Sequence, residues 1–315
     1  MDDSDQQRGR LVKDVVLVWF ESAEPGTAAG QHLEGTLQRL DEAAVPVAHV
    51  VAQTGASRPG WIARVKRLAL MQVRAVRAGG RERLLLGRMH PASLLPVALQ
   101  KLRGGSVVLM VQGNTADMHA AYPFTARLPI ETLFIKPTIA MSTSLVAPSA
   151  GILDWINHDL GLTTPRGFVL ENGFNGDSVA AVSPISTEEL AQMGLRHNGF
   201  VVFVGKFATW QGIDTILAAL DSEHWPDDLP IVFVGDGADE PLVVAAAARD
   251  SRVHYVGRVS AERALAWTGG AAMSLAVRKA GPASERGVSP YKVLEAAALG
   301  TPVVATRVRG QSSNG

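Results

Sequence analysis

The chain has 315 residues, of which 47% are hydrophobic and 19% are charged, and its formal net charge at pH 7 is zero. This composition is typical of a soluble globular protein long enough for two domains, and the neutral charge gives the whole molecule no attraction to nucleic acid or anionic lipid. The absence of cysteine excludes disulfides and thiolate metal sites. Because the start of the chain is acidic and polar, we expect no secretory signal and a cytoplasmic location.

Short apolar segments alternate with helical patterns along the first half of the chain. Strands are expected at residues 15–20, 47–52, 83–87, 106–112, 138–142 and 167–171. Helices are expected at residues 27–43, 61–77, 93–103 and 148–160. Because strands rich in Val, Ile and Leu that alternate with helices favour parallel sheets with right-handed crossovers, this half is predicted to be a doubly wound α/β domain.

The same alternation begins again in the second half. Strands are expected at residues 200–204, 231–234, 253–256, 272–276 and 303–305, and helices at residues 213–220, 240–249, 261–268 and 290–299. The prediction is therefore two Rossmann-like domains, residues 1–180 and 181–315, joined within the Gly-, Asn-, Ser- and Pro-rich segment 172–199. Since ligands of open parallel sheets lie beyond the carboxyl ends of the strands, we expect a site in the cleft where the two sheets face each other.

The most informative helix is the last one. Ser289 suits its N-cap, Pro290 its first turn, and Gly300 its end. Lys292 and Glu295 are three residues apart and so share one face. A helix start with free amides, such as that of Tyr291, and a nearby cation can hold a diphosphate, and a carboxylate one turn further on can accept hydrogen bonds from ribose hydroxyls. The alternative interpretation is an ordinary capped helix of an α/β sheet.

Three loops of the second half follow predicted strands. The first contains Gly205, Lys206 and Gln211, and places a compact positive charge at the end of a strand. The second, 235–237, is a Gly-Asp-Gly turn that resembles part of a dinucleotide fingerprint but has Glu where the third Gly would stand. In the third, the backbone of Arg258 and Val259 could meet a base edge. Each loop could also be a plain strand exit.

The first half offers weaker candidates. Gly30 lies in a Gly-containing helix start that could close over a phosphate or a sugar. His90 and His119 follow the third and fourth strands and could contact substrate, although lone histidines are usually structural or solvated.

One stretch of the first half is strongly basic. Residues 58–88 contain nine Arg or Lys and a single acid, Glu82. Five apolar residues are expected on the buried side of its helix, namely Ile62, Val65, Leu68, Val73 and Val76. The usual interpretation is a solvated helix face, and the alternative is docking on an anionic membrane surface at the inner membrane face.

Taken together, these loops resemble a GT-B glycosyltransferase of the nucleotide-sugar family 4, also called group 1. Residues 205–212 are similar to the family's Gly-Arg…Lys-Gly loop, residues 235–237 to its Gly-Asp-Gly turn, and residues 257–259 to its base-binding strand end. Residues 289–305 resemble the helix with the family's second Glu and the Gly-Thr-Pro-Val-Val-Ala that follows it. Residues 171–175 are similar to the segment that closes its amino domain. The resemblance implies a GT-B fold whose second domain lacks its usual C-terminal elements.

The resemblance also implies a function. A retaining, metal-independent transferase of hexosyl type would move a sugar from a nucleoside-diphosphate sugar, its donor substrate, to a sugar, lipid-linked or small-molecule acceptor, without a further cofactor. Lys206 and the amides of residues 290–292 would hold the diphosphate, Glu295 the ribose and the Val259 backbone the base. Such enzymes act in polysaccharide, glycolipid or glycoside assembly.

The sequence departs from the family pattern at several positions. Lys206 stands for the usual Arg, and Gln211 for the frequent Lys. The first Glu of the family's pair falls at Gly287, so Glu285 is the expected substitute after a loop shift. The amino-domain His of the family falls at Gln112, which leaves His119 or His90 for a role at the acceptor.

These departures leave two alternatives open. One is a truncated, non-catalytic relative that acts as a binding or partner subunit. The other is a nucleotide-sugar epimerase with the same pair of domains.

Overall fold

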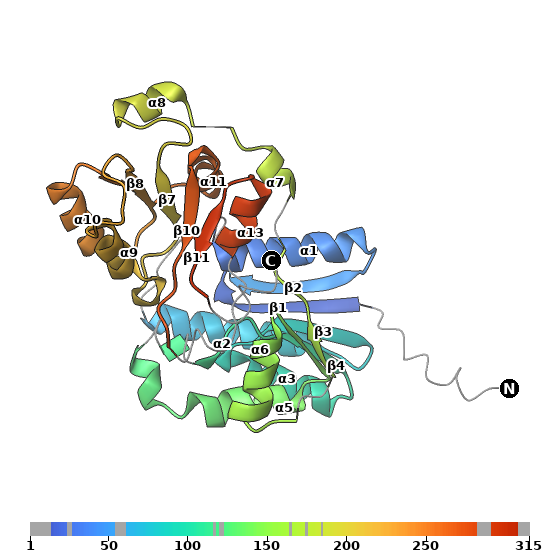
Figure 1. Cartoon of the computed structure of the whole chain (residues 1–315). Coiled ribbons are helices and arrows are strands. Elements are labelled where there is room, and N and C mark those ends of the chain that lie inside the picture. The colour runs from blue at the N-terminus through green and yellow to red at the C-terminus, as the bar shows by residue number, and fades with distance from the viewer. Residues whose placement is uncertain are drawn as a thin grey trace. The chain divides into compact units, whose positions relative to one another are not determined.

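The computed structural model describes residues 14–23, 27–53, 61–115, 118–119, 123–163, 166–173, 176–183, 185–281 and 291–307. Its contacts divide the chain into two compact units. The first comprises Met1–Thr115 and Pro123–Leu170, and the second comprises Ala116–Tyr122 and Glu171–Gly315. Each unit is built on its own sheet, the first drawn in blue to green and the second in yellow to red (Figure 1).

The first unit has a six-stranded sheet of order β2-β1-β3-β4-β5-β6, in which every pairing is parallel. Its strands are β1 (Asp14–Ser22), β2 (Val47–Gln53), β3 (Arg83–Arg88), β4 (Ser106–Met110), β5 (Ser144–Ala147) and β6 (Arg166–Val169). Its helices are α1 (Ala28–Glu42), α2 (Trp61–Ala78), α3 (Leu94–Leu102), α5 (Lys136–Met141) and α6 (Ala150–Asp154), with short 3-10 or π-helical turns at Pro91–Ser93, Pro123–Arg127, Glu131–Ile135 and Trp155–Asp159.

One expected strand of this unit is wrong. Residues 138–142 were expected to be extended, but they lie in and just after α5, and the strand follows at β5. Ile135 and Ile139, four residues apart, are both fully buried in the core of the first unit. A short buried apolar run has the same composition in a helix as in a strand, and Pro137 suits the first turn of this helix.

The buried side of α2 also differs from the expectation. Met71, Ala75 and Ala78 are buried, and α2 packs against β1, β2 and α3. Ile62, Val65 and Val73, which were expected on the inner face, are exposed. Leu68 is partly buried and packs against the core of the first unit as expected. It lies there with Met71 and with the small side chains of Ala75 and Ala78, which allow a close approach of the helix to the sheet.

The second unit has a five-stranded parallel sheet of order β11-β10-β7-β8-β9. Its strands are β7 (Val201–Val204), β8 (Ile231–Val234), β9 (Val253–Gly257), β10 (Met273–Ala276) and β11 (Val303–Ala305). Its helices are α7 (Gly176–Ala180), α8 (Thr187–Gln192), α9 (Ile213–Leu220), α10 (Glu240–Arg249), α11 (Ala261–Gly270) and α13 (Tyr291–Ala298), with a 3-10 turn at Thr209–Gln211. The strands and helices predicted from residue 200 onward are confirmed, whereas α7 and α8 lie in the segment expected to be an irregular join.

Aromatic side chains fill the core of the second unit on both faces of its sheet. Phe203, Phe207 and Phe233 are fully buried on one face, and their ring centroids are 6.0 to 6.1 Å apart. Phe200 and Trp267 form an edge-to-face pair in the cluster on the other face. Burial on both faces explains why these strands read as continuous apolar runs and not as alternating ones.

Candidate active site

The strand order of the second unit defines where a ligand can bind. From β7 the chain moves to β8 and β9 on one side, and it then crosses to β10 and β11 on the other. The direction in which successive strands are added to the sheet therefore reverses between β7 and β10. In open parallel sheets, ligands bind beyond the carboxyl ends of the strands at such a reversal. The relevant loops are residues 205–212 after β7 and residues 277–281 after β10.

Glycines bring the loops after β7 and β8 into backbone contact. Gly235 has φ 141°, and a Cβ there would lie 1.9 Å from the carbonyl oxygen of Gly205. Gly237 has φ 155°, and its Cβ would lie 2.4 Å from the carbonyl oxygen of Phe207. The amide of Phe207 donates to the carbonyl of Asp236 at 2.7 Å. The Gly-Asp-Gly turn is therefore required by the packing of the backbone, whether or not a nucleotide binds.

The ammonium at the end of β7 belongs to Lys292 of α13. Its Nζ donates to Oε1 of Gln211 at 3.1 Å and lies 4.1 Å from the centroid of the Phe203 ring. A Cβ built on Gly205 would be only 3.3 Å from the same Nζ. Residues from three places in the sequence therefore meet at the reversal point, and they present a cation and an amide.

Burial makes this ammonium easy to deprotonate. Burial lowers the pKa of Lys292; the Glu295 carboxylate opposes this effect and the Arg278 guanidinium adds to it, and together they take the pKa from 10.5 to about 7. Gln211 contributes hydrogen bonding without charge. A bound anion would add to the effect of the Glu295 carboxylate and would hold the ammonium in its protonated form.

A second set of contacts fixes the loop that carries Gln211. The amide of Lys279 donates to the carbonyl of Trp210 at 2.9 Å, and the Lys279 ammonium donates to the carboxylate of Asp214 at 2.6 Å. Gly212 has φ 68°, and a Cβ there would lie 2.6 Å from the side chain of Val277. The loops after β7 and β10 are thus joined at the reversal point.

The predicted residues of this unit are placed as follows. Lys206 is exposed; its carbonyl accepts from the amide of Ala208 at 2.9 Å, and among the described residues its ammonium has no hydrogen-bond or ion-pair partner. Glu295 lies near enough to Lys292 to raise its pKa, as their spacing predicted. Tyr291 is the first residue of α13. The predicted Glu285, Ser289 and Pro290 lie outside the described residues.

The base-binding candidates lie at the end of β9. The Arg258 guanidinium is 4.0 Å from the carboxylate of Asp236, which belongs to the Gly-Asp-Gly turn. Val259 is partly buried and packs against the core. Tyr255, at the same strand end, donates its hydroxyl to the Glu240 carboxylate at 2.8 Å. Burial and this carboxylate raise the pKa of Tyr255 to about 12, so it stays a neutral hydrogen-bond donor.

The first unit has its own reversal point, between β1 and β3, and an ion pair marks it. The Arg88 guanidinium lies 3.1 Å from the Glu21 carboxylate and 5.7 Å from the centre of the Trp19 ring. Burial raises the pKa of Glu21, and Arg88 partly opposes this effect. The pair therefore places charged groups at the carboxyl edge of this sheet as well.

His32 of α1 lies beside this pair, and no sequence argument singled it out. Its ring is edge-on to Trp19 at 5.2 Å, and its Nε2 is 3.5 Å from Nε2 of Gln112. Burial and the Arg88 charge lower the pKa of His32 to about 4, so the imidazole is neutral at pH 7. His32 Nδ1 and Trp19 Nε1 are buried without a hydrogen-bond partner among the described residues. The only sequence signal was its place one turn into the helix that follows β1.

The other candidates of the first unit have structural roles or different surroundings. Gly30 is buried, and its amide donates to the N-cap hydroxyl of Thr27 at 3.1 Å. Nδ1 of His90 accepts from the amide of Ala92 at 3.1 Å and so caps a 3-10 turn. Burial lowers the pKa of His90 to about 4. His119 is partly exposed, in the short segment Ala116–Tyr122 that groups with the second unit.

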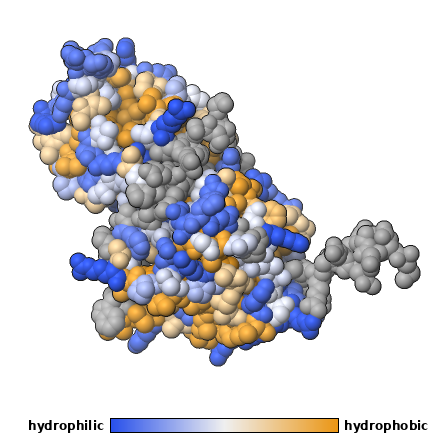
Figure 2. Space-filling model, turned by 60° about the horizontal axis from the view of Figure 1, so that its bottom comes forward, coloured by the Kyte–Doolittle hydropathy of each residue, from blue (hydrophilic) through white to orange (hydrophobic). Residues whose placement is uncertain are grey.

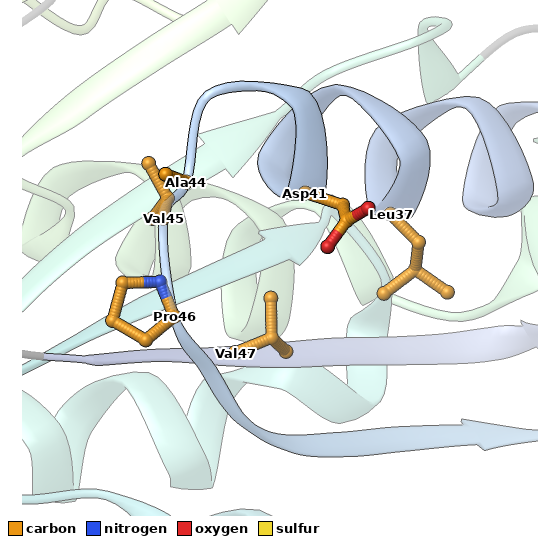
Figure 3. A pocket seen from close by; sticks show the side chains of 6 residues that line it. All are labelled: Leu37, Asp41, Ala44, Val45, Pro46 and Val47. Atoms are coloured by element: carbon orange, nitrogen blue, oxygen red, sulfur yellow. The ribbon is translucent and has the colours of Figure 1, made fainter.

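A separate hollow of about 510 Å³ lies at the end of α1 and the start of β2, and is lined by Leu37, Asp41, Ala44, Val45, Pro46 and Val47 (Figure 3). It is at the amino edge of the sheet, away from the edge where ligands of parallel sheets bind. Within the described ranges, no cluster of His, Asp or Glu could hold a metal ion, and no helix is long and apolar enough to cross a membrane.

Comparisons with known proteins agree with this topology. Residues 198–314 match the family model described as "Glycosyl transferases group 1". Sucrose-phosphate synthase from Thermosynechococcus elongatus is 15% identical, with TM-score 0.65 over 95% of this chain and 82% of that chain. HepE from Anabaena, in complex with UDP-glucose, is 16% identical, with TM-score 0.61 over 94% and 81%.

WaaG, a glycosyltransferase involved in lipopolysaccharide biosynthesis, is 16% identical, with TM-score 0.64 over 95% of this chain and 82% of that chain. A search of curated proteins found no match. The predicted family and the predicted pair of parallel α/β domains are confirmed. Residues 198–314 are thus similar to the group 1 glycosyltransferases, and the fold of the chain is GT-B.

Proposed function

We propose that this glycosyltransferase moves a hexosyl group from a UDP-sugar to an acceptor hydroxyl with retention of anomeric configuration, without a metal ion. The observation that carries the proposal is the Lys292 ammonium, which lies at the reversal point of the second sheet beside Gly205 and Gln211. The similar HepE structure contains UDP-glucose, which supports a uridine diphosphate donor. The acceptor class stays open among sugars, lipid-linked sugars and small molecules.

Catalysis in this proposal is electrostatic. When the bond between the sugar and the diphosphate breaks, negative charge develops on the departing phosphate oxygen. Lys292 and the amides at the start of α13 stabilise that charge. The acceptor hydroxyl attacks the same face of the sugar, and its proton passes to the departing phosphate. Lys206, which is exposed at the end of β7, supplies a second cation once a diphosphate is bound.

The rest of the donor is assigned to neighbouring strand ends. Glu295 accepts hydrogen bonds from the ribose hydroxyls, and the backbone of Val259 meets the base, with Arg258 beside it. Glu285, Ser289 and Pro290 retain the roles that the family resemblance implies for them. For the acceptor, the first unit offers the neutral imidazole of His32 and the Arg88–Glu21 pair at the carboxyl edge of its own sheet, and the second unit offers His119.

The non-catalytic alternative loses part of its support. It rested partly on the loss of a cation at Gln211, but Gln211 accepts a hydrogen bond from a Lys that α13 supplies. Helix α13 therefore brings an amino group to this strand end, and a bound diphosphate would hold it in the charged form.

Calorimetric titration with UDP at pH 7 tests the proposal. Removal of the ammonium in Lys292→Met is expected to weaken UDP binding roughly 30-fold, which corresponds to about 2 kcal/mol for hydrogen bonds to a charged group. Glu295→Gln is expected to weaken it less, because a neutral amide still accepts from ribose. Lys101→Met, at an exposed lysine of the first unit, is the matched control and should bind as wild type does. Unchanged affinity in folded Lys292→Met would reject the assignment.

A further inference from the structure

Gln211 is the side chain by which the loop after β7 contacts the Lys292 ammonium. Its Oε1 accepts from Nζ of Lys292 at 3.1 Å, and its own backbone amide donates to the carbonyl of Ala208 at 2.7 Å. Gln211 ends a 3-10 turn of three residues, a short element with poor hydrogen-bond geometry. The position of its side chain therefore depends on contacts that the loop makes with other parts of the chain.

Two hydrogen bonds from Lys279, in the segment after β10, flank Gln211. The backbone amide of Lys279 donates to the carbonyl of Trp210 at 2.9 Å, one residue before Gln211. The Lys279 ammonium donates to the carboxylate of Asp214 at 2.6 Å, three residues after Gln211. A single residue thus holds the chain on both sides of Gln211.

Both partners of this ion pair are themselves held in place. The second carboxylate oxygen of Asp214 accepts from the amide of Thr215 at 2.9 Å, in the first turn of α9, where the helix amides favour a negative charge. Next to Lys279, the amide of Arg278 donates to the hydroxyl of Thr306, which follows β11, at 2.9 Å. The pair therefore joins the start of a helix to a segment that is bound to the neighbouring strand end.

An ordinary surface ion pair is the simplest interpretation of this contact. The side chains of Lys279 and Asp214 are 40% and 51% exposed, and hydrophilic residues are spread among apolar ones over the face that Figure 2 shows. Exposed ion pairs contribute little to the stability of a fold. What distinguishes this pair is the residue between its two anchors, because Gln211 contacts Lys292.

We propose that Asp214 and Lys279 are a positioning pair, which holds Gln211 against Lys292 and so keeps the ammonium directed at the donor diphosphate. Neither residue is catalytic, because both act through Gln211. Without the pair, Gln211 leaves Lys292 for part of the time, and the ammonium loses a hydrogen-bond acceptor. The contact with the ammonium can be tested in the free protein, whereas the consequence for the diphosphate rests on the proposed function.

Calorimetric titration with UDP-glucose measures the consequence for the donor. Asp214→Asn and Lys279→Met are each expected to weaken binding about three- to fivefold, the most that an exposed ion pair ordinarily contributes. Because the two side chains act as one unit, the double variant should lose no more affinity than either single variant.

A direct contact between Lys279 and the phosphates would give a different pattern. Lys279→Met would then weaken binding, but Asp214→Asn, which releases the ammonium from its partner, would strengthen it. Opposite effects of the two substitutions on affinity would therefore overturn the proposal.

The titration of Lys292 in the free protein is a second measurement, which needs no donor. It is followed by NMR of the full chain with carbon-13 in its lysine side chains, and Lys292→Met identifies the resonance. Among the described residues, the charged groups that shift this pKa are Glu295 of α13 and Arg278 after β10. Neither group is changed in any variant.

The sign of the pKa shift separates positioning from charge. By charge alone, the loss of Asp214 would lower the pKa of Lys292, and the loss of Lys279 would raise it. If the pair positions Gln211, both variants should lower this pKa from about 7, because the hydrogen bond to Gln211 favours the charged form.

The ion pair at the other end of α9 is the matched control. The Arg249 guanidinium lies 2.8 Å from the carboxylate of Asp221, and these side chains are 58% and 52% exposed. Asp221→Asn and Arg249→Met remove the same charges and should change neither the affinity for UDP-glucose nor the pKa of Lys292. In a Gln211→Met background, which lacks the acceptor, Asp214→Asn should weaken binding no further.

Three results would reject the positioning pair. They are shifts of the Lys292 pKa in opposite directions in Asp214→Asn and Lys279→Met, wild-type affinity in both variants, and equal losses in the control pair. Failure of the donor site gives a different outcome, in which Lys292→Met binds UDP as wild type does. If both variants still lower the pKa of Lys292 in that case, the pair positions Gln211 and only the proposed function is rejected.

Discussion

Lys292 carries the chemistry that we propose for the second unit, and its protonated and neutral forms are about equally populated near pH 7. A pKa of about 7 means that about half of the free molecules carry a neutral amine at pH 7. Its contacts with Gln211 and the Phe203 ring hold the amine in place in either state. A diphosphate shifts this balance because it favours the protonated form.

This balance predicts a pH dependence for donor binding. UDP-glucose is the suitable probe, because its diphosphate does not titrate between pH 6 and 8.5. With a free-state pKa of about 7, its affinity should be nearly constant below pH 6.5 and should fall by up to tenfold per pH unit above pH 7. Lys292→Arg keeps its charge and should show a flat profile. A flat wild-type profile in calorimetry would mean that Lys292 does not meet the diphosphate.

A substitution at Gly237 tests whether the turn after β8 requires a residue without a side chain. Its φ of 155° and the 2.4 Å approach of an added Cβ to the Phe207 carbonyl leave no room for a side chain. Gly237→Ala is expected to reduce the free energy of unfolding by about 2 kcal/mol or more, measured by urea denaturation. Gly173→Ala, where an added Cβ meets nothing within 4 Å, should be close to neutral. Equal stability of the two variants would contradict the steric argument.

At the scale of elements, helix α1 contains Gly35, a glycine that neither a turn nor a close contact requires. Gly35 lies in the helix interior, and an added Cβ would have no neighbour within 4 Å. Gly35→Ala is therefore expected to raise the free energy of unfolding by about 0.5–1 kcal/mol, because it lowers the entropy of the unfolded chain. The check is the midpoint of urea denaturation. A lower midpoint would show that Gly35 makes close contacts that the structure does not contain.

The elements also show what could be predicted from sequence. β8, α9, α10 and β11 were placed with their observed bounds, because each has an apolar run of one clear length between turn residues. α5 was taken for a strand because six residues are too few to display a helical period. The buried side of α2 was predicted only in part: Leu68 packs against the core, but Ile62 and Val65 are exposed. Apolar residues occur on more than one side of this helix, and only packing selects the buried side.

For the candidate site, local sequence patterns predicted contacts within one helix but not contacts between distant parts of the chain. The pairing of Lys292 with Glu295 on one helix face followed from their spacing. The contact between Lys292 and Gln211 joins residues 81 positions apart, and no local pattern predicts it. The arrangement of His32 with Trp19 and Arg88 depends on the order of β1 and β3, so only the tertiary structure shows it.

At the scale of the whole molecule, buried histidines predict sensitivity to acid. His32 and His90 have pKa values lowered from 6.5 to about 4, so the unfolded chain binds more protons between these values. Each therefore contributes a loss of stability, at most about 1.4 kcal/mol per pH unit, as pH falls from 6.5 to 4. Glu21 opposes this loss, because its raised pKa favours proton uptake by the folded state.

Thermal unfolding at pH 7 and pH 4.5 checks this prediction. The wild type should melt at a lower temperature at pH 4.5, and His32→Gln should show a smaller difference between the two pH values. His224→Gln is the control, because the side chain of His224 is 85% exposed. If His32→Gln and the control show the same pH difference as the wild type, His32 is not buried as a neutral imidazole.

The arrangement of the two sheets has a consequence for how the protein is made. β1 to β6 all come from residues 14–169, and the first strand of the other sheet begins at Val201. A nascent chain can therefore complete the first sheet while the second is still being translated, for roughly ten seconds at ordinary elongation rates. During that interval the ribosome carries one finished α/β unit, and the residues of the second sheet are added to a chain whose first sheet is already folded.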